Sequence, residues 1–335
     1  MGGFFSAQSS FWNFLLFIGY IITGDILEFF IIILAAVIVV FLGVLFYYFN
    51  IAFVKMDKGN LADLDHIENA ILADYREIVQ GGMDYINNQP HEWVETKSFD
   101  GLKLMGRYYD NNCDKTMLLF HGYRSLSARD FSCAVKMYSD MGFNVLLVDQ
   151  RAHGKSQGKL ITFGVKESRD VLSWVNFLNK NYGEKNLALG GMSMGATTVL
   201  LAAGLDLPKN VKCIVADCGF TSPKEIIKLV AKRNFKVNAD YFLPFLNLYC
   251  LIFGHFSILK ASTVDSVKKS NLPILFIHGK NDGFVPCDMS QTAYDAIKER
   301  AEIVLIDEAD HGMAFLVDTK TVHSKLEDFL KRNTA

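Results

Sequence analysis

A lone serine, Ser193, lies between glycines in the stretch "GGMSMG" of this 335-residue chain. The pattern Gly191-x-Ser193-x-Gly195 follows an apolar run and precedes a run of helix-forming residues. A serine on such a tight turn can act as a nucleophile, and the backbone N–H of the next residue, Met194, can stabilise an oxyanion. Because a serine hydroxyl is unreactive without a base, the rest of the chain must supply one.

The expected partners of this serine follow it in the sequence, each after a further apolar run. Asp282 lies in "HGKNDGFVP" and His311 lies in "DEADHGM". We predict that His311 accepts the serine proton and that Asp282 holds the imidazole in the correct tautomer. Asp217, which also ends an apolar run, is the alternative acid, and His153 is the alternative base. A serine that only shapes a turn is the non-catalytic interpretation, against which the matching Asp and His argue.

A second oxyanion donor is expected in the loop "LLFHGYRS", which follows an earlier apolar run. We predict that the backbone N–H of Tyr123 is this donor, together with that of Met194. The prediction uses only the backbone of Tyr123, so it assigns no role to the tyrosine side chain. We assign His121 no role in proton transfer.

The elements that must position these residues alternate between apolar strands and helical patterns. A hairpin is expected in "WVETKSFDGLKLMGRYYD", with its turn at Asp100-Gly101. This alternation predicts a mostly parallel sheet that is covered by helices on both faces. The expected strands are Met117–Phe120, Val145–Val148, Leu187–Gly190, Val211–Ala216, Ile274–Ile277 and Ile303–Ile306, and the expected helices lie near Ala128–Tyr138, Lys166–Leu178, Met194–Ala203, Ser290–Lys298 and Thr319–Leu330.

One interval interrupts the alternation. About fifty residues separate the strand that ends near Asp217 from the strand that begins at Pro273, far more than a crossover loop needs. We predict a helical cap insertion at about 219–270, over the C-terminal edge of the sheet, and expect it to govern substrate choice. It contains "YFLPFLNLYCLIFGHFSI", which is either a cap that packs on its own core or a surface that docks on lipid.

The N-terminal region has the composition of a membrane segment. Phe29–Phe49 comprises 21 residues without a charge, which matches the length of a helix that crosses a bilayer. We place this transmembrane helix at about 27–50, within a membrane segment over 1–54. A buried core helix is disfavoured because the run is apolar on every face, and a signal peptide because no Lys or Arg precedes it. The shorter run Phe11–Ile22 fits an interfacial helix or half of a hairpin.

Charge and cysteine content narrow the remaining choices. Lys55 and Lys58 follow the span, so the positive-inside tendency places the C-terminal domain in the cytoplasm, after one or two passes. The net charge of -2, without a basic cluster, argues against a nucleic-acid partner. Six scattered cysteines without a CxxC pair indicate reduced thiols rather than disulfides or a zinc site.

An amphipathic helical connector is expected over 55–92, between the membrane segment and the C-terminal domain.

Taken together, these motifs resemble those of the α/β-hydrolase superfamily from about Trp93 to the C-terminus. The similarity is greatest to its Bem46-like and serine-aminopeptidase-like serine hydrolases. It rests on His121-Gly122, "DQRAHGKS", the turn at Ser193, "GKNDGFVP" and "DHG". The resemblance implies an α/β-hydrolase fold over 93–335, a triad of Ser193, Asp282 and His311, and no cofactor or metal. It also implies that Arg151 and His153 shape their loop.

The function expected from these features is that of a membrane-anchored serine hydrolase. It would cleave carboxylic esters of acyl or lipid-like groups through an acyl-enzyme intermediate. Esters are favoured because an alkoxide leaving group needs less help than an amine. The expected partners are a small-molecule or lipid-like ester and the bilayer. The alternatives are an amidase or aminopeptidase-type hydrolase, and a non-catalytic binding module on the same fold.

Overall fold

The computed structural model describes residues 4–55 and 74–335, and the chain divides into two compact units, Met1–Ile51 and Ala52–Ala335. A single helix, α1 (Phe4–Phe53), accounts for the first unit. The apolar runs Phe11–Ile22 and Phe29–Phe49 therefore lie on one continuous helix and do not form a hairpin. Within it, Ile26–Phe53 is long and apolar enough to be a candidate membrane span.

The predicted connector over 55–92 is described only in part. Residues 56–73, which include Lys58 and the first half of the expected amphipathic pattern, lie outside the described residues. The second half forms the helix α3 (Arg76–Asn88), whose Val79 and Ile86 are buried. Apolar residues seven positions apart lie on one face of a helix, so α3 packs that face against the rest of the second unit.

Eight strands of the described chain form one sheet in the order β1-β2-β4-β3-β5-β6-β7-β8. Strand β2 is antiparallel to both neighbours, and the other pairs are parallel. This is the α/β-hydrolase arrangement that the sequence predicts, with the expected hairpin at its start. The strands are β1 (Glu92–Lys97), β2 (Lys103–Tyr109), β3 (Lys115–Phe120), β4 (Asn144–Asp149), β5 (Asn186–Met192), β6 (Val211–Asp217), β7 (Ile274–Gly279) and β8 (Ala301–Ile306).

Helices cover both faces of this sheet, and the strand side chains alternate between them. Leu118 of β3 packs with Trp174 on one face, whereas its neighbour Leu119 packs with Val135 and Phe329 on the other. Burial on both sides explains why the strands are apolar runs rather than alternating patterns. The helices are α4 (Ser127–Asp130), α5 (Ala134–Asp140), α6 (Glu167–Tyr182), α7 (Met194–Ala202), α8 (Pro223–Val230), η3 (Ala231–Phe235), η4 (Ala239–Tyr241), α9 (Leu243–Gly254), α10 (Thr263–Lys268), α11 (Asp288–Asp295), α12 (Ala314–Val317) and α13 (Thr319–Asn333).

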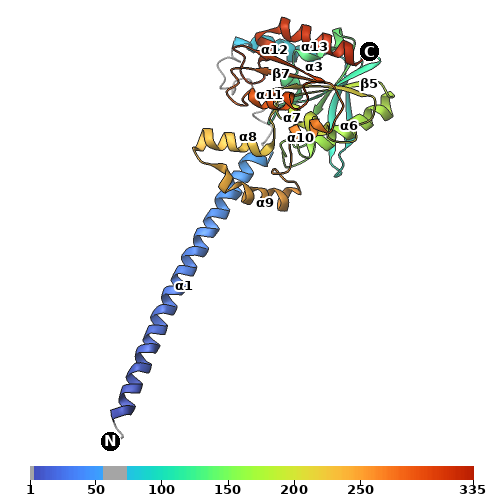
Figure 1. Cartoon of the computed structure of the whole chain (residues 1–335). Helices are drawn as coiled ribbons and strands as arrows, with labels where there is room; N and C mark the ends of the chain where they lie inside the picture. The colour runs from blue at the N-terminus through green and yellow to red at the C-terminus, as the bar shows by residue number, and fades with distance from the viewer. Residues whose placement is uncertain (1–3, 56–73) are drawn as a thin grey trace. The chain divides into compact units, whose positions relative to one another are not determined.

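The insertion between β6 and β7 differs from the predicted cap at its C-terminal end. Helices α8 and α9 lie outside the sheet layer (Figure 1). Helix α10, which the prediction included, belongs to the body, because its Val267 is fully buried in the same cluster as Val199 of α7 and Ile274 of β7. The cap proper therefore ends before Thr263. A segment of six residues such as "TVDSVK" is too short for its periodicity to reveal which core it joins.

Candidate active site

The turn between β5 and α7 carries Ser193 in a strained backbone conformation, with φ 55° and ψ -115°. A Cβ atom added to Gly191 would overlap the carbonyl group of Gly195, and one added to Gly195 would overlap the carbonyl oxygen of Phe120. No side chain fits at either position, because at Gly191 the turn folds tightly on itself and at Gly195 it packs against the end of β3. The spacing seen in the sequence is the spacing that such a turn needs.

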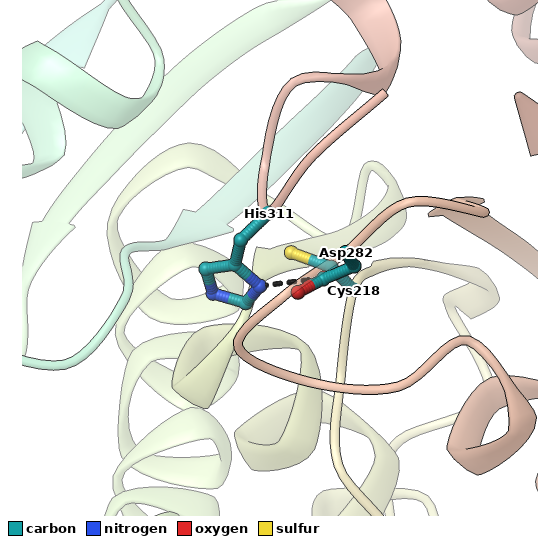
Figure 2. Close-up of side chains that lie close together, drawn as sticks. All are labelled: Cys218, Asp282 and His311. Carbon is teal, nitrogen blue, oxygen red and sulfur yellow. Dashed lines mark hydrogen bonds and ion pairs between the residues drawn. The ribbon is translucent and has the colours of Figure 1, made fainter. Parts of the chain in front are cut away.

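The structure brings the three predicted side chains together beyond the C-terminal ends of β5, β7 and β8. The Oγ atom of Ser193 lies 2.9 Å from Nε2 of His311. On the other side of the ring, Nδ1 of His311 lies 2.7 Å from Oδ2 of Asp282 (Figure 2). Both distances are those of hydrogen bonds. In this arrangement His311 can take a proton from the serine while Asp282 accepts a hydrogen bond from Nδ1–H.

The carboxylate of Asp282 is held on both oxygens. Its Oδ1 accepts the backbone N–H groups of Phe284 and Val285, at 2.8 and 2.7 Å. Its Oδ2 is shared by His311 and His278, the latter at 3.0 Å. Burial alone would raise the pKa of Asp282, but the hydrogen bonds from His278 and His311 outweigh burial and hold it well below its usual range. Asp282 is therefore an anion beside the His311 ring.

His278 is the one member of this network that the sequence analysis did not single out. It lies at the C-terminal end of β7, its side chain is fully buried, and its Nδ1 lies 2.7 Å from Oγ of Ser290. The hydroxyl can donate to Nδ1, which leaves Nε2–H to face Asp282 and the carbonyl of Val285. The only signal in the sequence was its place in "FIHGKND", four residues before Asp282.

The alternative acid, Asp217, lies close by at the end of β6 but has different contacts. Its carbonyl oxygen accepts the N–H of Ser193 at 2.8 Å. Its buried Oδ1 has no hydrogen-bond partner among the described residues. Burial, above all, raises the pKa of Asp217 to about 6. The structure thus places Asp282, and not Asp217, against the imidazole of His311.

Cys218 lies next to this network, with its sulfur directed towards it (Figure 2). One ligand atom each from Cys218, Asp282 and His311 lie within 4.8 Å of one another, which makes these side chains the one set of metal donors found in the described part of the chain. Burial raises the pKa of the Cys218 thiol well above its ordinary value. A divalent ion held here would need the thiolate and would compete for the side chains that form the His311–Asp282 hydrogen bond.

The predicted oxyanion loop, which follows β3, packs against the serine. A Cβ atom added to Gly122 would lie 3.4 Å from the Cβ of Ser193. The Gly122 N–H donates to Oδ2 of Asp130 at 2.7 Å, which fixes the loop. Over residues 74–335, neither the N–H of Tyr123 nor that of Met194 has a hydrogen-bond acceptor. Two backbone donors beside the nucleophile are the parts from which an oxyanion hole is built.

The remaining histidines near this rim have structural contacts. His153, the alternative base, is buried, and its Nε2 accepts the backbone N–H of Arg124 at 3.0 Å. The Nε2 of His121 likewise accepts the N–H of Gln150 at 3.1 Å. Burial lowers the pKa of both rings, so both are neutral. Arg151, in the same loop as His153, pairs with buried Asp170 at 2.7 Å.

A cavity of about 670 Å³ opens beside Ser193 and His311. It extends over the sheet face that α5, α12 and α13 cover, and its lining is mostly apolar, including Leu119, Ile277 and Leu326. Its volume is typical of a small-molecule site. None of the described residues that line it comes from the insertion over 219–270. The expectation that the insertion governs substrate choice therefore finds no support in this cavity.

Comparison with known proteins agrees with this architecture. The family described as the alpha/beta hydrolase fold matches residues 115–248, and the family described as TAP-like protein matches residues 257–335. The solved structure of the esterase Pf2001 from Pyrococcus furiosus is 31% identical, with a TM-score of 0.60 over 75% of this chain and 96% of that one.

Two curated relatives are more distant in sequence. The uncharacterized protein YqkD of Bacillus subtilis is 26% identical over 216 residues, which are 64% of this chain and 70% of the relative. The lysophosphatidylserine lipase ABHD12 of Danio rerio is 24% identical over 261 residues, which are 71% of this chain and 65% of that protein.

Proposed function

This chain belongs to the α/β-hydrolase family, and we propose that it is a membrane-anchored serine hydrolase that cleaves carboxylic esters of acyl or lipid-like groups. The observation that carries the proposal is the unbroken hydrogen-bonded series from Asp282 through His311 to Ser193, which lies at the mouth of an apolar cavity. The similarity to an esterase and to a lysophosphatidylserine lipase supports ester hydrolysis.

In the proposed mechanism, Ser193 Oγ attacks the ester carbonyl while His311 Nε2 takes the hydroxyl proton. The negative oxygen of the tetrahedral intermediate accepts the N–H groups of Tyr123 and Met194. His311 then donates its proton to the leaving alkoxide, and the acyl group stays on Ser193. A water molecule attacks this acyl-enzyme and gives a proton to His311. His311 returns the proton to Ser193 Oγ as the acyl bond breaks, which releases the carboxylic acid and restores the free serine. Asp282 stays ionised throughout and stabilises the imidazolium.

The substrate class follows from the cavity. Its apolar lining between the sheet and α13 accepts the acyl part of the ester, where burial of methylene groups contributes about 0.8 kcal/mol each. The polar groups of the lining, such as Asp130 and Asp310, are outnumbered by apolar ones. This favours an acyl ester over an aminopeptidase substrate.

The anchor in this proposal is α1. The apolar stretch at about 27–50, part of the candidate span Ile26–Phe53, crosses the bilayer within the segment 1–54, and the connector over 55–92 follows. The hydrolase domain over 93–335 lies on the cytoplasmic side because Lys55 and Lys58 follow the span. Cysteine accessibility in intact cells tests the side: Cys113 and Cys133, both partly exposed, should resist a membrane-impermeant thiol reagent until the cells are opened.

The nucleophile is tested with a fluorophosphonate probe on the full chain in detergent. Wild type should be labelled and Ser193→Ala should not, whereas Ser173→Ala, a partly exposed serine on α6 away from the cavity, should label like wild type. Equal labelling of wild type and Ser193→Ala would refute the assignment of the nucleophile. A wild type that does not label would favour a binding module. Turnover of esters, acylglycerols and aminoacyl amides then separates esterase from amidase.

A further inference from the structure

The cap helix α9 exposes an apolar face within the second unit. Its sequence, "LPFLNLYCLIFG", contains no charged residue. Leu243, Leu246 and Cys250 are buried beneath it, whereas Leu248 and Ile252 on the outer face are 50% and 57% exposed. A helix that faced only water would carry polar residues at these outer positions. An exposed apolar face of this kind marks a surface that contacts something other than water.

Further apolar residues in and around α9 are exposed. Leu251 of α9 is 45% exposed, Tyr241, two residues before the helix, is 81% exposed, and Leu259, five residues after it, is 38% exposed. A tyrosine at the edge of an apolar face is typical of elements that lie at the level of lipid headgroups, because its ring is apolar and its hydroxyl is polar.

The cap carries more positive than negative residues, which favours binding to a negatively charged surface. Residues 219–262 contain six Lys and Arg but only two Asp and Glu, in a chain whose net charge is -2. Lys228 pairs with Asp240 at 2.5 Å, while Lys232 and Lys236, in and after η3, are exposed. An exposed apolar helix on a segment with an excess of Lys and Arg can bind anionic membranes both by burial of apolar surface and by charge attraction.

The end of the candidate membrane span lies beside this helix. Phe53, the last residue of α1 and part of the second unit, is completely buried. Its ring packs on Phe163 and on Phe256, at centroid distances of 5.2 and 5.7 Å, and Phe256 follows α9 by two residues.

Backbone contacts hold the same end of the chain in place. The Phe53 carbonyl accepts the N–H of Ile161 at 2.7 Å. The Ala52 carbonyl accepts the hydroxyl of Tyr123 at 2.8 Å. The first residues of the second unit are therefore held close to the residues that follow α9.

We infer that the outer face of α9, formed by Tyr241, Leu248, Leu251, Ile252 and Leu259, docks on an anionic lipid bilayer. The inference rests on the proposed membrane anchor. In this inference α9 lies in the surface layer of the bilayer. The competing occupants of this face are a second copy of the chain and the segment 56–73, which lies outside the described residues.

Depth-dependent fluorescence quenching tests the docking. The full chain with Ile252→Trp is reconstituted in vesicles of phosphatidylcholine and phosphatidylglycerol, about 3:1, whose acyl chains carry bromine near the headgroup. The fluorescence added by the new tryptophan should fall by roughly half, because interfacial helices bury about 5–10 Å into this layer. Leu205→Trp is the control, since Leu205 is exposed but follows α7 at the opposite rim of the sheet. Its added fluorescence should not change.

Fluorescence of the Ile252→Trp chain that is not quenched overturns the inference, whether a second copy or the chain itself covers this face. The anchor is measured separately by flotation with the vesicles. A chain that does not float refutes the anchor and the docking together, whereas a floating chain without quenching refutes only the docking. Neither measurement needs enzymatic activity, so failure of the proposed hydrolysis is distinguishable from both.

Introduction of negative charge on this face supplies a second test. Leu248→Glu with Ile252→Glu should lower turnover of a long-chain ester embedded in vesicles by about tenfold, because each buried carboxylate opposes insertion. Turnover of a short soluble ester should stay within about twofold, since neither residue lines the cavity. Equal losses on the two substrates would contradict the inference.

Discussion

His278 and His311 approach the same carboxylate oxygen: Oδ2 of Asp282 lies 3.0 Å from Nε2 of the first and 2.7 Å from Nδ1 of the second. Only His311 also reaches Ser193. His278 is completely buried, so its contact with Asp282 serves to orient the carboxylate. We regard His278 as a positioning residue that acts through Asp282.

Replacement of His278 should therefore affect turnover more than substrate binding. We expect His278→Gln to lower kcat by about tenfold while KM changes less than about twofold, because the carboxylate loses a fixed orientation and the cavity is unaltered. Steady-state kinetics with a soluble ester measure both constants. Ser290→Ala, which removes only the partner of Nδ1, should give a smaller loss of kcat. A matched rise in KM would instead indicate general loosening of the site.

The identity of the acid is decided by two matched substitutions. Asp282→Asn should lower kcat by about 10³–10⁴-fold, because the amide no longer holds the productive tautomer of His311. Asp217→Asn, which removes a carboxyl that has no hydrogen-bond contact with His311, should cost less than about tenfold. The reverse order of the two losses would transfer the role of the acid to Asp217.

The raised pKa of Asp217 predicts a pH dependence of stability. The folded protein holds this proton up to about pH 6, whereas the ordinary value is 3.8. Protonated Asp217 therefore stabilises the folded state by about 1–3 kcal/mol. This stabilisation is fully present below pH 3.8, the ordinary pKa, and is lost as the pH rises through about 6.

Melting temperatures of wild type and Asp217→Asn at pH 5 and pH 8 check this sign. Relative to wild type, the melting temperature of Asp217→Asn should be higher at pH 8 than at pH 5, because the asparagine cannot ionise. Asp282, whose pKa is lowered, is ionised throughout this range and adds no such slope. If the difference in melting temperature between the two proteins is the same at both pH values, Asp217 is not a buried group that titrates in this range.

The packing of the nucleophile turn predicts that even a small side chain at position 195 disrupts the site. A methyl group there would overlap the carbonyl oxygen of Phe120, so Gly195→Ala should abolish probe labelling and lower the melting temperature by many degrees. Gly81→Ala is the control. A Cβ at Gly81, inside α3, meets nothing within 4 Å and should stabilise the helix by up to about 1 kcal/mol. Labelling retained in Gly195→Ala would contradict the observed contact.

The lining of the cavity predicts how acyl preference can be changed. Val322 of α13 lines the cavity, so Val322→Phe should shorten it and lower the ratio of kcat/KM for a decanoyl over an acetyl ester by about tenfold. Val237→Phe, at an exposed cap position that does not line the cavity, should leave this ratio unchanged. The opposite pattern would place the acyl group beneath the cap.

Much of the arrangement could be predicted because strand ends carry recognisable turns. Gly-x-Ser-x-Gly, "KNDG" and "DHG" each follow an apolar run, and parallel strands bring their C-terminal ends to one rim. His278 could not be found in this way. Its role depends on Ser290 and Asp282 lying on either side of its ring, a relation that no local spacing encodes.

The sequence did not predict the cavity, for a related reason. Its lining residues come from separate strands, from α5 and from α13, and in the sequence each of them resembles an ordinary core residue. The apolar insertion drew attention because it was locally unusual. Helix α10, at the end of the predicted insertion, is too short for periodicity to reveal the core it joins.

None of the described residues that line the cavity comes from the insertion, and this separation bears on how such an enzyme can diverge. Under the proposed function, substitutions in α5 or α13 can retune which acyl chain is accepted without disturbing the outer face of α9. If α9 docks on lipid as we infer, changes in α9 can in turn adapt the protein to a different lipid environment while the selectivity of the cavity is inherited intact.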